Sequence, residues 1–236
     1  MGKRAIFYDT ETTGLKPDKD RIIEIAAFDP ELNRTFCKFI NPQIPIPEVS
    51  TKISGITDEM VKDGQTFAIV GKEFFEFCSG DVILIAHNND RFDKIFLEEE
   101  SKRSLIKMPN YKYIDTLLWA KKYRPDLPKH SLQYLREIYE IKANNAHRAL
   151  DDVVILYNVF SLMTEDLTID EIYDLIYTAN NNAITQMPFG KHKGVPLDKI
   201  PKYYIKWLAS SGALDKDMNK NLKDNIEKMG LLNEAD

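Results

Sequence analysis

The chain has 236 residues, of which 43% are hydrophobic and 29% are charged, and its formal net charge is −5. These values are typical of a globular protein with a sizeable core, and the negative balance argues against a protein that coats nucleic acid by bulk attraction, although not against an enzyme whose acidic site is neutralised by metals. The longest fully apolar run, residues 82–86, is too short to span a bilayer, and residues 1–10 carry no secretory signal, so we expect a cytoplasmic protein without membrane partners.

Strand-like segments dominate the first forty residues. Residues 4–9, 22–28 and 34–40 are rich in Ile and Phe and are separated by short polar turns. Connections this short predict three strands with antiparallel neighbours. A proline-punctuated loop, "NPQIPIPEVS", follows over residues 41–50.

Further along, helical patterns alternate with two more strands. Residues 81–87 form a nearly continuous apolar run, which is typical of a strand in a sheet covered on both faces, and a short strand is predicted at 112–115. The predicted helices cover residues 67–78, 90–103, 115–123, 131–140, 146–163 and 168–179. This order of strands and helices predicts an α/β sandwich with a mixed sheet.

The character of the chain changes at "MPFGKHKGVP", residues 187–196, which follows an Asn-rich stretch. Two short helices are predicted after it, at 201–210 and 216–229. We therefore expect a main domain over 1–166, a helix and Asn-rich linker over 167–186, and a small basic module over 187–230. The two cysteines, Cys37 and Cys78, have no metal-binding spacing, and we expect both to be reduced and buried.

Two acids, Asp9 and Glu11, end the first strand in "FYDTETTGL". Side chains two apart on a strand point the same way, so these like charges repel, and a divalent cation between them would relieve the repulsion. The spacing alone is weak evidence, because Asp18 and Asp20 share it in a polar loop.

Two later stretches add candidate functional residues. "AHNNDRFDKIFL", residues 86–97, sets Asp93 just beyond an apolar strand, and "HRALDD", residues 147–152, sets His147 five residues before Asp152. Five helical residues would turn the two side chains apart, so they converge more easily if His147 lies on the preceding loop or first turn.

In this order the motifs D-x-E, H-N-x-x-F-D and H-x-A-x-x-D resemble those of the DEDDh subgroup of DnaQ-like 3′→5′ exonucleases, across residues 4–163. One motif departs from the pattern, because "HNNDRFD" is one residue longer. The segment "TKISGITDEMV", residues 51–61, also fits the family, and "PFGKHKGVPLDKIPKYYIKWL", residues 188–208, resembles the segment that follows the nuclease domain in exodeoxyribonuclease X-like proteins. The resemblance implies an RNase H-like mixed five-stranded sheet flanked by helices, with a small, mostly helical C-terminal module.

The resemblance also implies a reaction. Asp9, Glu11, Asp93 and Asp152 would hold two Mg²⁺ or Mn²⁺ ions, Asp9 bridging both, and His147 would take the proton from the attacking water. The substrate would be DNA, single-stranded or duplex at its 3′ end, and the products nucleoside 5′-monophosphates. Protein partners are not indicated.

Nucleic-acid contacts are expected at two places. Beside the catalytic residues the expected contacts are Thr12, Gly14, Ile53, Ile56, Asn88 and Phe92. In the tail they are Lys191, His192 and Lys193, where lysines alternate with aromatic residues in a pattern that suits single strands. The competing interpretation of the tail is that Phe189, Tyr204 and Trp207 form a small core that the lysines merely solvate.

Other polar residues have plainer interpretations. Asp115 is predicted to cap a helix, His87 and Asn88 to shape the turn of the second motif, and His130 to lie on a loop. Glu24 is either outward-facing or a supporting residue. Two alternative functions stay open, an RNA-trimming exonuclease with the same metals and a non-catalytic, polymerase-associated nucleic-acid-binding module.

Overall fold

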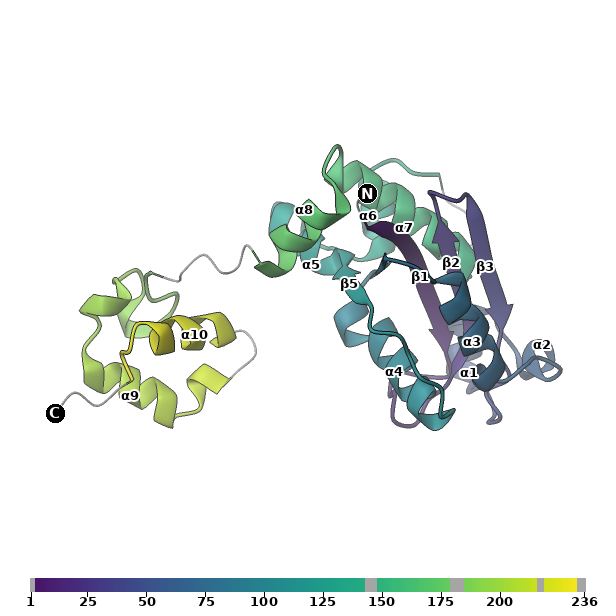
Figure 1. The fold of residues 1–236 in the computed structure, drawn as a ribbon, viewed down its shortest axis with the longest axis horizontal. Coiled ribbons are helices and arrows are strands. Elements are labelled where there is room, and N and C mark those ends of the chain that lie inside the picture. The colour runs from purple at the N-terminus through teal and green to yellow at the C-terminus, as the bar shows by residue number, and fades with distance from the viewer. Residues whose placement is uncertain (1–2, 143–147, 179–184, 216–218, 233–236) are drawn as a thin grey trace. The chain divides into compact units, whose positions relative to one another are not determined.

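The computed structural model describes residues 3–142, 148–178, 185–215 and 219–232. The chain divides into two compact units, Met1–Tyr173 and Asp174–Asp236, which are described separately (Figure 1). The first unit carries every acidic motif of the sequence, and the second contains the Gly- and Lys-rich segment.

The first unit is built on one five-stranded sheet with the order β3-β2-β1-β4-β5. The strands are β1 (Arg4–Thr12), β2 (Ile22–Asp29), β3 (Arg34–Phe39), β4 (Val82–Ala86) and β5 (Lys112–Asp115). β1 to β3 form an antiparallel meander, whereas β4 pairs with β1, and β5 with β4, in parallel. The mixed five-stranded sheet that the sequence predicts is therefore confirmed.

Helices cover both faces of this sheet, which explains the apolar strands at its centre (Figure 1). Tyr8 packs toward α3 (Phe67–Phe77) with its ring 5.9 Å from that of Phe74. Its neighbour Phe7 points to the other face, 5.3 Å from Tyr157 on α7 (Ala149–Thr164). This alternation along β1 places every second side chain on the α7 side of the sheet.

The remaining helices of the first unit connect and flank these layers. They are α1 (Glu48–Ser54), α2 (Asp58–Val61), α4 (Asp93–Arg103), α5 (Thr116–Tyr123), α6 (Leu132–Ile138) and α8 (Ile169–Tyr173), together with a 3-10 turn, η1 (Asn89–Arg91), and a π-helical turn over Asp174–Thr178 that begins the second unit. The sequence prediction missed α1 and α2. Both are short, and their boundaries rest on local caps, namely Gly55 at φ +72° after α1 and the Thr57 side chain at the start of α2.

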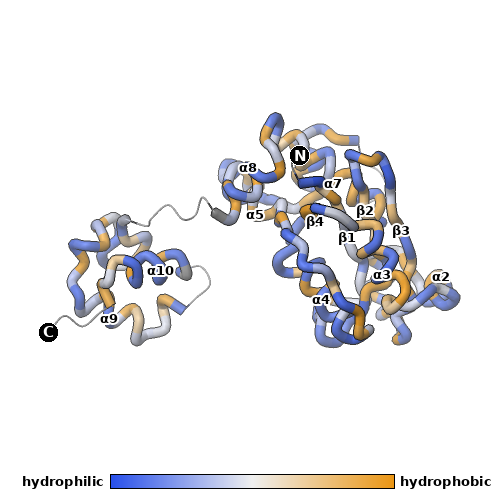
Figure 2. Tube along the Cα trace, in the orientation of Figure 1, coloured by the Kyte–Doolittle hydropathy of each residue, from blue (hydrophilic) through white to orange (hydrophobic). Residues whose placement is uncertain are grey.

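The second unit has an aliphatic core. Met187, Leu197, Ile200, Ile205, Leu208, Leu214, Leu222 and Ile226 are buried together. They come from the loop region and from α9 (Lys202–Ser210) and α10 (Lys220–Lys228). In Figure 2, α10 is mostly hydrophilic, because only its inward positions Leu222 and Ile226 are buried apolar residues.

The aromatic residues of this unit divide between core and surface. Phe189 and Tyr204 pack against the core, but Trp207 is 56% exposed, so a mini-core that includes Trp207 is wrong. The expectation that both cysteines are buried is also wrong, since Cys78 is buried and Cys37, on the outer strand β3, is exposed. Among the described residues, no helix is long and apolar enough to cross a membrane.

Candidate active site

β1 carries Asp9 and Glu11 on the face that α7 covers. In the ladder with β2, Asp9 lies opposite Ala26 and Glu11 lies opposite Glu24, and the register shifts just beyond Glu11. The small Ala26 side chain leaves space beside Asp9, and the irregularity ends the regular ladder at the acidic pair.

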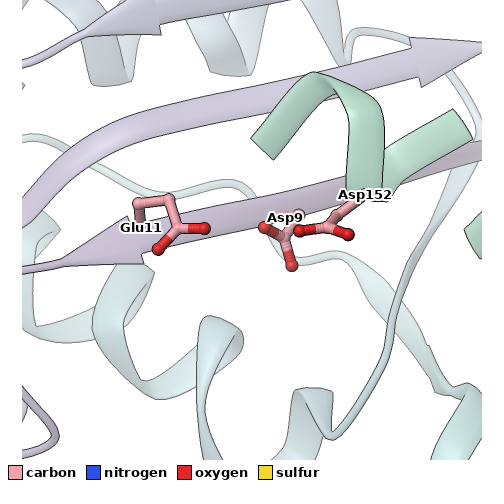
Figure 3. A group of neighbouring side chains, drawn as sticks. All are labelled: Asp9, Glu11 and Asp152. Atoms are coloured by element: carbon pink, nitrogen blue, oxygen red, sulfur yellow. The ribbon is translucent and has the colours of Figure 1, made fainter. Parts of the chain in front are cut away.

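The helix α7 brings a third carboxylate to the pair. One oxygen each of Asp9, Glu11 and Asp152 lie within 4.8 Å of one another. Figure 3 shows Asp9 and Glu11 projecting from β1 and Asp152 from the first turn of α7, with their carboxylates turned toward a common space. Residues about 140 positions apart in the sequence thus form one acidic cluster.

Two carboxylates of this cluster have raised pKa values. Burial, and after it the charges of Asp93, Glu11 and Asp152, raise the pKa of Asp9 well above its ordinary value. Burial and the neighbouring Asp152 and Glu24 raise the pKa of Glu11 to about 8. Carboxylates that repel one another in this way form a donor set of hard oxygens, which fits a divalent cation.

Asp93 lies close to this cluster, bonded to Thr10, the β1 residue between Asp9 and Glu11. It is the first residue of α4, is buried, and accepts hydrogen bonds from the amide (3.1 Å) and hydroxyl (2.7 Å) of Thr10. Burial raises the pKa of Asp93, although the bonds from Thr10 oppose that rise. Asp93 is not among the three residues whose oxygens lie within 4.8 Å, but its charge contributes to the raised pKa of Asp9.

The second motif contains a 3-10 turn, η1, that Asp115 holds in place. The Asp115 carboxylate accepts hydrogen bonds from the amides of Asn88 (2.9 Å) and Asp90 (3.2 Å), and it also caps α5 through the Leu117 amide (2.9 Å). Asn88 adopts a left-handed backbone conformation at φ +67°. The cap predicted for Asp115 is therefore confirmed.

His87 is structural, as expected. Its Nδ1 lies 2.8 Å from the Thr116 hydroxyl oxygen and its Nε2 lies 2.8 Å from the carbonyl oxygen of His130. Burial lowers the pKa of His87, so the neutral ring joins the end of β4 to the segment before α6.

A supporting residue that the sequence left undecided is Glu24. It is 1% exposed, and its carboxylate accepts a hydrogen bond from the Ala149 amide (3.1 Å) and pairs with the Arg148 guanidinium (3.2 Å). The carboxylate thus satisfies a free amide at the N-terminus of α7, where negative charge is favoured. Glu24 fixes the turn of α7 that carries Asp152.

A second supporting residue, Gln133 on α6, was not predicted. Its Nε2 donates to Oδ1 of Asp152 (2.9 Å), and its own Oε1 accepts from Nε of Arg136 (2.9 Å). Arg136 in turn donates to the Ile141 carbonyl (3.1 Å). This chain of bonds orients the Asp152 carboxylate.

A pocket of about 240 Å³ opens beside Glu11. Its lining includes four of the predicted nucleic-acid contacts, namely Thr12, Gly14, Ile53 and Phe92. The exposed apolar side chains of Leu15 and Val49, which the sequence did not single out, also line it.

Two other predicted contacts lie elsewhere. Ile56 is completely buried in a small cluster with Ile23, Ile46 and Val61, so its side chain cannot reach a ligand in this pocket. The contact predicted for Ile56 stays a prediction, and in this structure the position packs the α1–α2 region onto the sheet. Asn88 lines a separate pocket with residues 128–132.

The remaining predicted residues cannot be placed at the cluster. His147 lies outside the described residues. Lys191, His192 and Lys193 belong to the second unit, where Lys191 and Lys193 are exposed and the His192 ring packs 4.6 Å from that of Tyr204.

Known proteins are similar to this chain in sequence and in architecture. The family described as Exonuclease (RNase_T) matches residues 6–160, and one described as "Putative quorum-sensing-regulated virulence factor" matches residues 179–227. The chain is 37% identical to the DNA polymerase III subunit epsilon of Treponema pallidum over 161 residues, which are 66% of this chain and 74% of that protein. It is 32% identical to the PolC-type DNA polymerase III of Caldanaerobacter subterraneus over 229 residues, 96% of this chain but 15% of the polymerase.

Solved structures agree on the fold. A zinc-bound complex of E. coli exonuclease I with single-stranded DNA aligns with a TM-score of 0.65 at 22% identity, covering 77% of this chain and 44% of that one. Exonuclease X in complex with 5′ overhanging duplex DNA aligns with a TM-score of 0.55 at 21% identity, covering 73% and 99%. The predicted RNase H-like architecture is thereby confirmed, and the family match over residues 6–160 establishes that the chain belongs to the DnaQ-like exonuclease family.

Proposed function

We propose that the chain is a metal-dependent 3′→5′ exonuclease that releases nucleoside 5′-monophosphates from the 3′ ends of DNA. The observation that carries this proposal is the convergence of Asp9, Glu11 and Asp152 within 4.8 Å of one another. The relatives whose names specify a DNA polymerase subunit or a 3′-5′ exonuclease support the polarity and the DNA substrate.

The acidic residues would hold the metal. Asp9, Glu11 and Asp152 supply the converging oxygens, and Asp93 supplies a fourth buried charge beside them. When bound, divalent cations supply Lewis-acid activation of water and stabilise the charge of the leaving oxygen. A four-carboxylate set balances two such ions, which is the stoichiometry we propose.

The general base in this proposal is His147. An imidazole titrates near neutral pH, so it can accept the proton of the attacking water under ordinary conditions. His147 directly precedes Arg148 in the sequence, and the Glu24–Arg148 pair anchors the chain at that point. Glu24 and Gln133 would keep Asp152 in place beside β1.

The pocket beside Glu11 would receive the terminal nucleotide. Leu15, Val49 and Ile53 are 81%, 64% and 56% exposed, which offers an apolar surface for a base or sugar next to the acidic cluster. Burying such side chains against an aromatic base recovers hydrophobic free energy without reading the base identity.

The test is a degradation assay on matched oligonucleotides. With Mg²⁺ or Mn²⁺, a 5′-labelled DNA strand should shorten stepwise from its 3′ end, a 3′-labelled strand should release labelled mononucleotide at once, and EDTA should stop both. Asp9→Ala or Asp152→Ala should leave a folded protein with no more activity than the EDTA control. Wild-type rates in either variant would refute the assignment of these ligands.

Two alternatives have separate signatures in the same assay. A faster turnover of an RNA strand of the same sequence would identify an RNA-trimming enzyme. The assay has to decide this, because no residue of the sequence is recognised as a reader of the 2′-hydroxyl group. Binding without any cleavage would identify a non-catalytic module. The similarity to polymerase subunits also supports action beside a polymerase in the cytoplasm, which co-purification of the full chain with a polymerase would test.

A further inference from the structure

The outer face of α9 in the second unit carries two large aromatic side chains that the core does not use. Tyr203 is 66% exposed and Trp207 is 56% exposed. The inward positions of the same helix are Ile205 and Leu208, both 1% exposed. At 100° per residue, Tyr203 and Trp207 lie one turn apart on the side opposite this buried pair. Covering two such rings with another molecule would recover hydrophobic free energy.

The chemistry around the two rings is basic. Lys202 and Lys206, also one turn apart, are exposed and flank the aromatic pair along the helix. Between residues 187 and 208 the sequence has five lysines and one acid, Asp198. A surface with this charge complements a polyanion and repels a basic partner.

Ring contacts connect this face to the Gly- and Lys-rich loop. The Trp207 ring lies 5.5 Å from that of Tyr204, and Tyr204 lies 4.6 Å from His192. Aromatic groups therefore continue from α9 to the loop that carries the exposed Lys191 and Lys193. Tyr204 also packs closely against this loop, because a Cβ added at Gly190 would lie 2.6 Å from the Tyr204 hydroxyl oxygen.

We propose that Tyr203 and Trp207, flanked by Lys202 and Lys206, form a binding site for single-stranded DNA on the second unit. Unpaired bases would stack on the two rings while the lysines contact the phosphates. Single strands fit this combination because their bases are free to stack, whereas a duplex presents mainly its backbone. The site does not depend on the cleavage chemistry, so it can be tested independently of the proposed nuclease activity.

Trp207 itself reports on this binding. The chain has two tryptophans, and Trp119 is buried in the first unit, so Trp119→Phe leaves Trp207 as the sole tryptophan. The full-length chain, carrying Asp9→Asn as well and kept in EDTA, would be titrated with a thymidine oligonucleotide of about 12 nucleotides. Stacking should quench and saturate the Trp207 fluorescence, and a duplex of the same length should compete poorly.

Substitutions then separate stacking from charge. Trp207→Ala, followed by anisotropy of a labelled strand, should weaken binding roughly 5- to 100-fold, the equivalent of the stacking free energy of one base. Lys202→Ser with Lys206→Ser should lower the slope of log K against log salt by about 0.7 for each phosphate that a lysine no longer neutralises. Matched controls are Met229→Ala and Lys228→Ser, which remove an exposed apolar residue and an exposed lysine near the end of α10.

Three results would overturn the proposal. The first is tight binding of the strand with no change in Trp207 fluorescence. The second is an equal loss of affinity in the α10 control variants. The third is a Trp207 signal that follows protein concentration instead of DNA, together with a dimer in sedimentation that Trp207→Ala dissociates, because a second copy of the chain would then cover this face.

Discussion

Glu24 on β2 and Ala149 at the start of α7 are joined by a hydrogen bond of 3.1 Å from the Ala149 amide to the Glu24 carboxylate. The same carboxylate pairs with Arg148, so the α7 N-terminus is fixed to the strand that lies beside Asp9 and Glu11. The distance between Asp152 and the β1 acids therefore depends on a residue that contributes no oxygen to the 4.8 Å cluster.

Glu24→Gln should reduce the turnover number roughly 10-fold or more with little change in KM, because Asp152 would be displaced while the pocket for the nucleotide stays intact. The neutral amide loses the ion pair with Arg148 and weakens the cap of α7. Steady-state kinetics in Mg²⁺ would measure this split. Asp151→Asn, a change to the neighbouring acid in the first turn of α7, is the control and should retain activity. Equal effects of both changes would contradict a specific role for Glu24.

Gln133→Leu should raise the Mg²⁺ concentration needed for half-maximal activity roughly 10- to 100-fold, since Asp152 loses the donor that orients it. Gln133→Glu should be worse, because a carboxylate there repels Asp152. The metal-activation curve of each variant is the measurement, and saturating Mn²⁺ should restore much of the rate. An unchanged curve for Gln133→Leu would show that Asp152 is held by other groups.

Without divalent metal, the folded protein should lose stability as pH rises from about 4.5 toward 8. The pKa of Glu11 is raised from 4.5 to about 8, so the folded state binds this proton more tightly than the unfolded state. The stability that Glu11 contributes is fully present below its pKa in the unfolded state and is lost as pH rises past its pKa in the folded state. Urea unfolding in EDTA at several pH values would reveal the slope. Saturating Mg²⁺ should flatten it, whereas Glu11→Gln should only reduce it, because the pKa values of Asp9 and Asp93 stay raised. A slope of the opposite sign would contradict the shift.

Gly190→Ala should destabilise the second unit and leave nuclease activity nearly unchanged. Gly190 has φ +73°, which costs an L-residue roughly 1–2 kcal/mol, and the added Cβ would lie 2.6 Å from the Tyr204 hydroxyl oxygen. Trp207 fluorescence in the Trp119→Phe background would follow the melting of this unit. Tyr204→Phe removes the hydroxyl, so the double variant should recover the steric part of the loss. Absence of any recovery would mean that backbone strain accounts for the whole effect.

The sequence predicted the features that depend on short-range pattern. The Ile- and Phe-rich segment at residues 4–9 identified β1, the alternation of strand side chains set Asp9 and Glu11 on one side, and the apolar run at 82–86 identified β4. The sequence did not predict the short helices α1 and α2, because seven and four residues are too few to show a helical period and only their caps mark them.

The supporting contacts lay beyond the reach of sequence reasoning for a different reason. Glu24 meets Glu11 through the register of two strands, and Gln133 meets Asp152 through the packing of α6 on α7, so both depend on tertiary structure. The exposure of Trp207 was within reach. Ile205 and Leu208 define the inward side of α9, and position 207 falls opposite them.

Because its acids are divided between β1 and α7, the acidic cluster can be completed only late in the synthesis of the first unit. During synthesis Asp9 and Glu11 leave the ribosome long before Asp152, which is carried by α7, near the end of the first unit. A nascent or truncated chain that lacks α7 contains Asp9, Glu11 and Asp93 but not Asp152, so the cluster of three converging carboxylates cannot form. The acidic cluster is therefore complete only once α7, the long helix near the end of the first unit, has docked on the finished sheet.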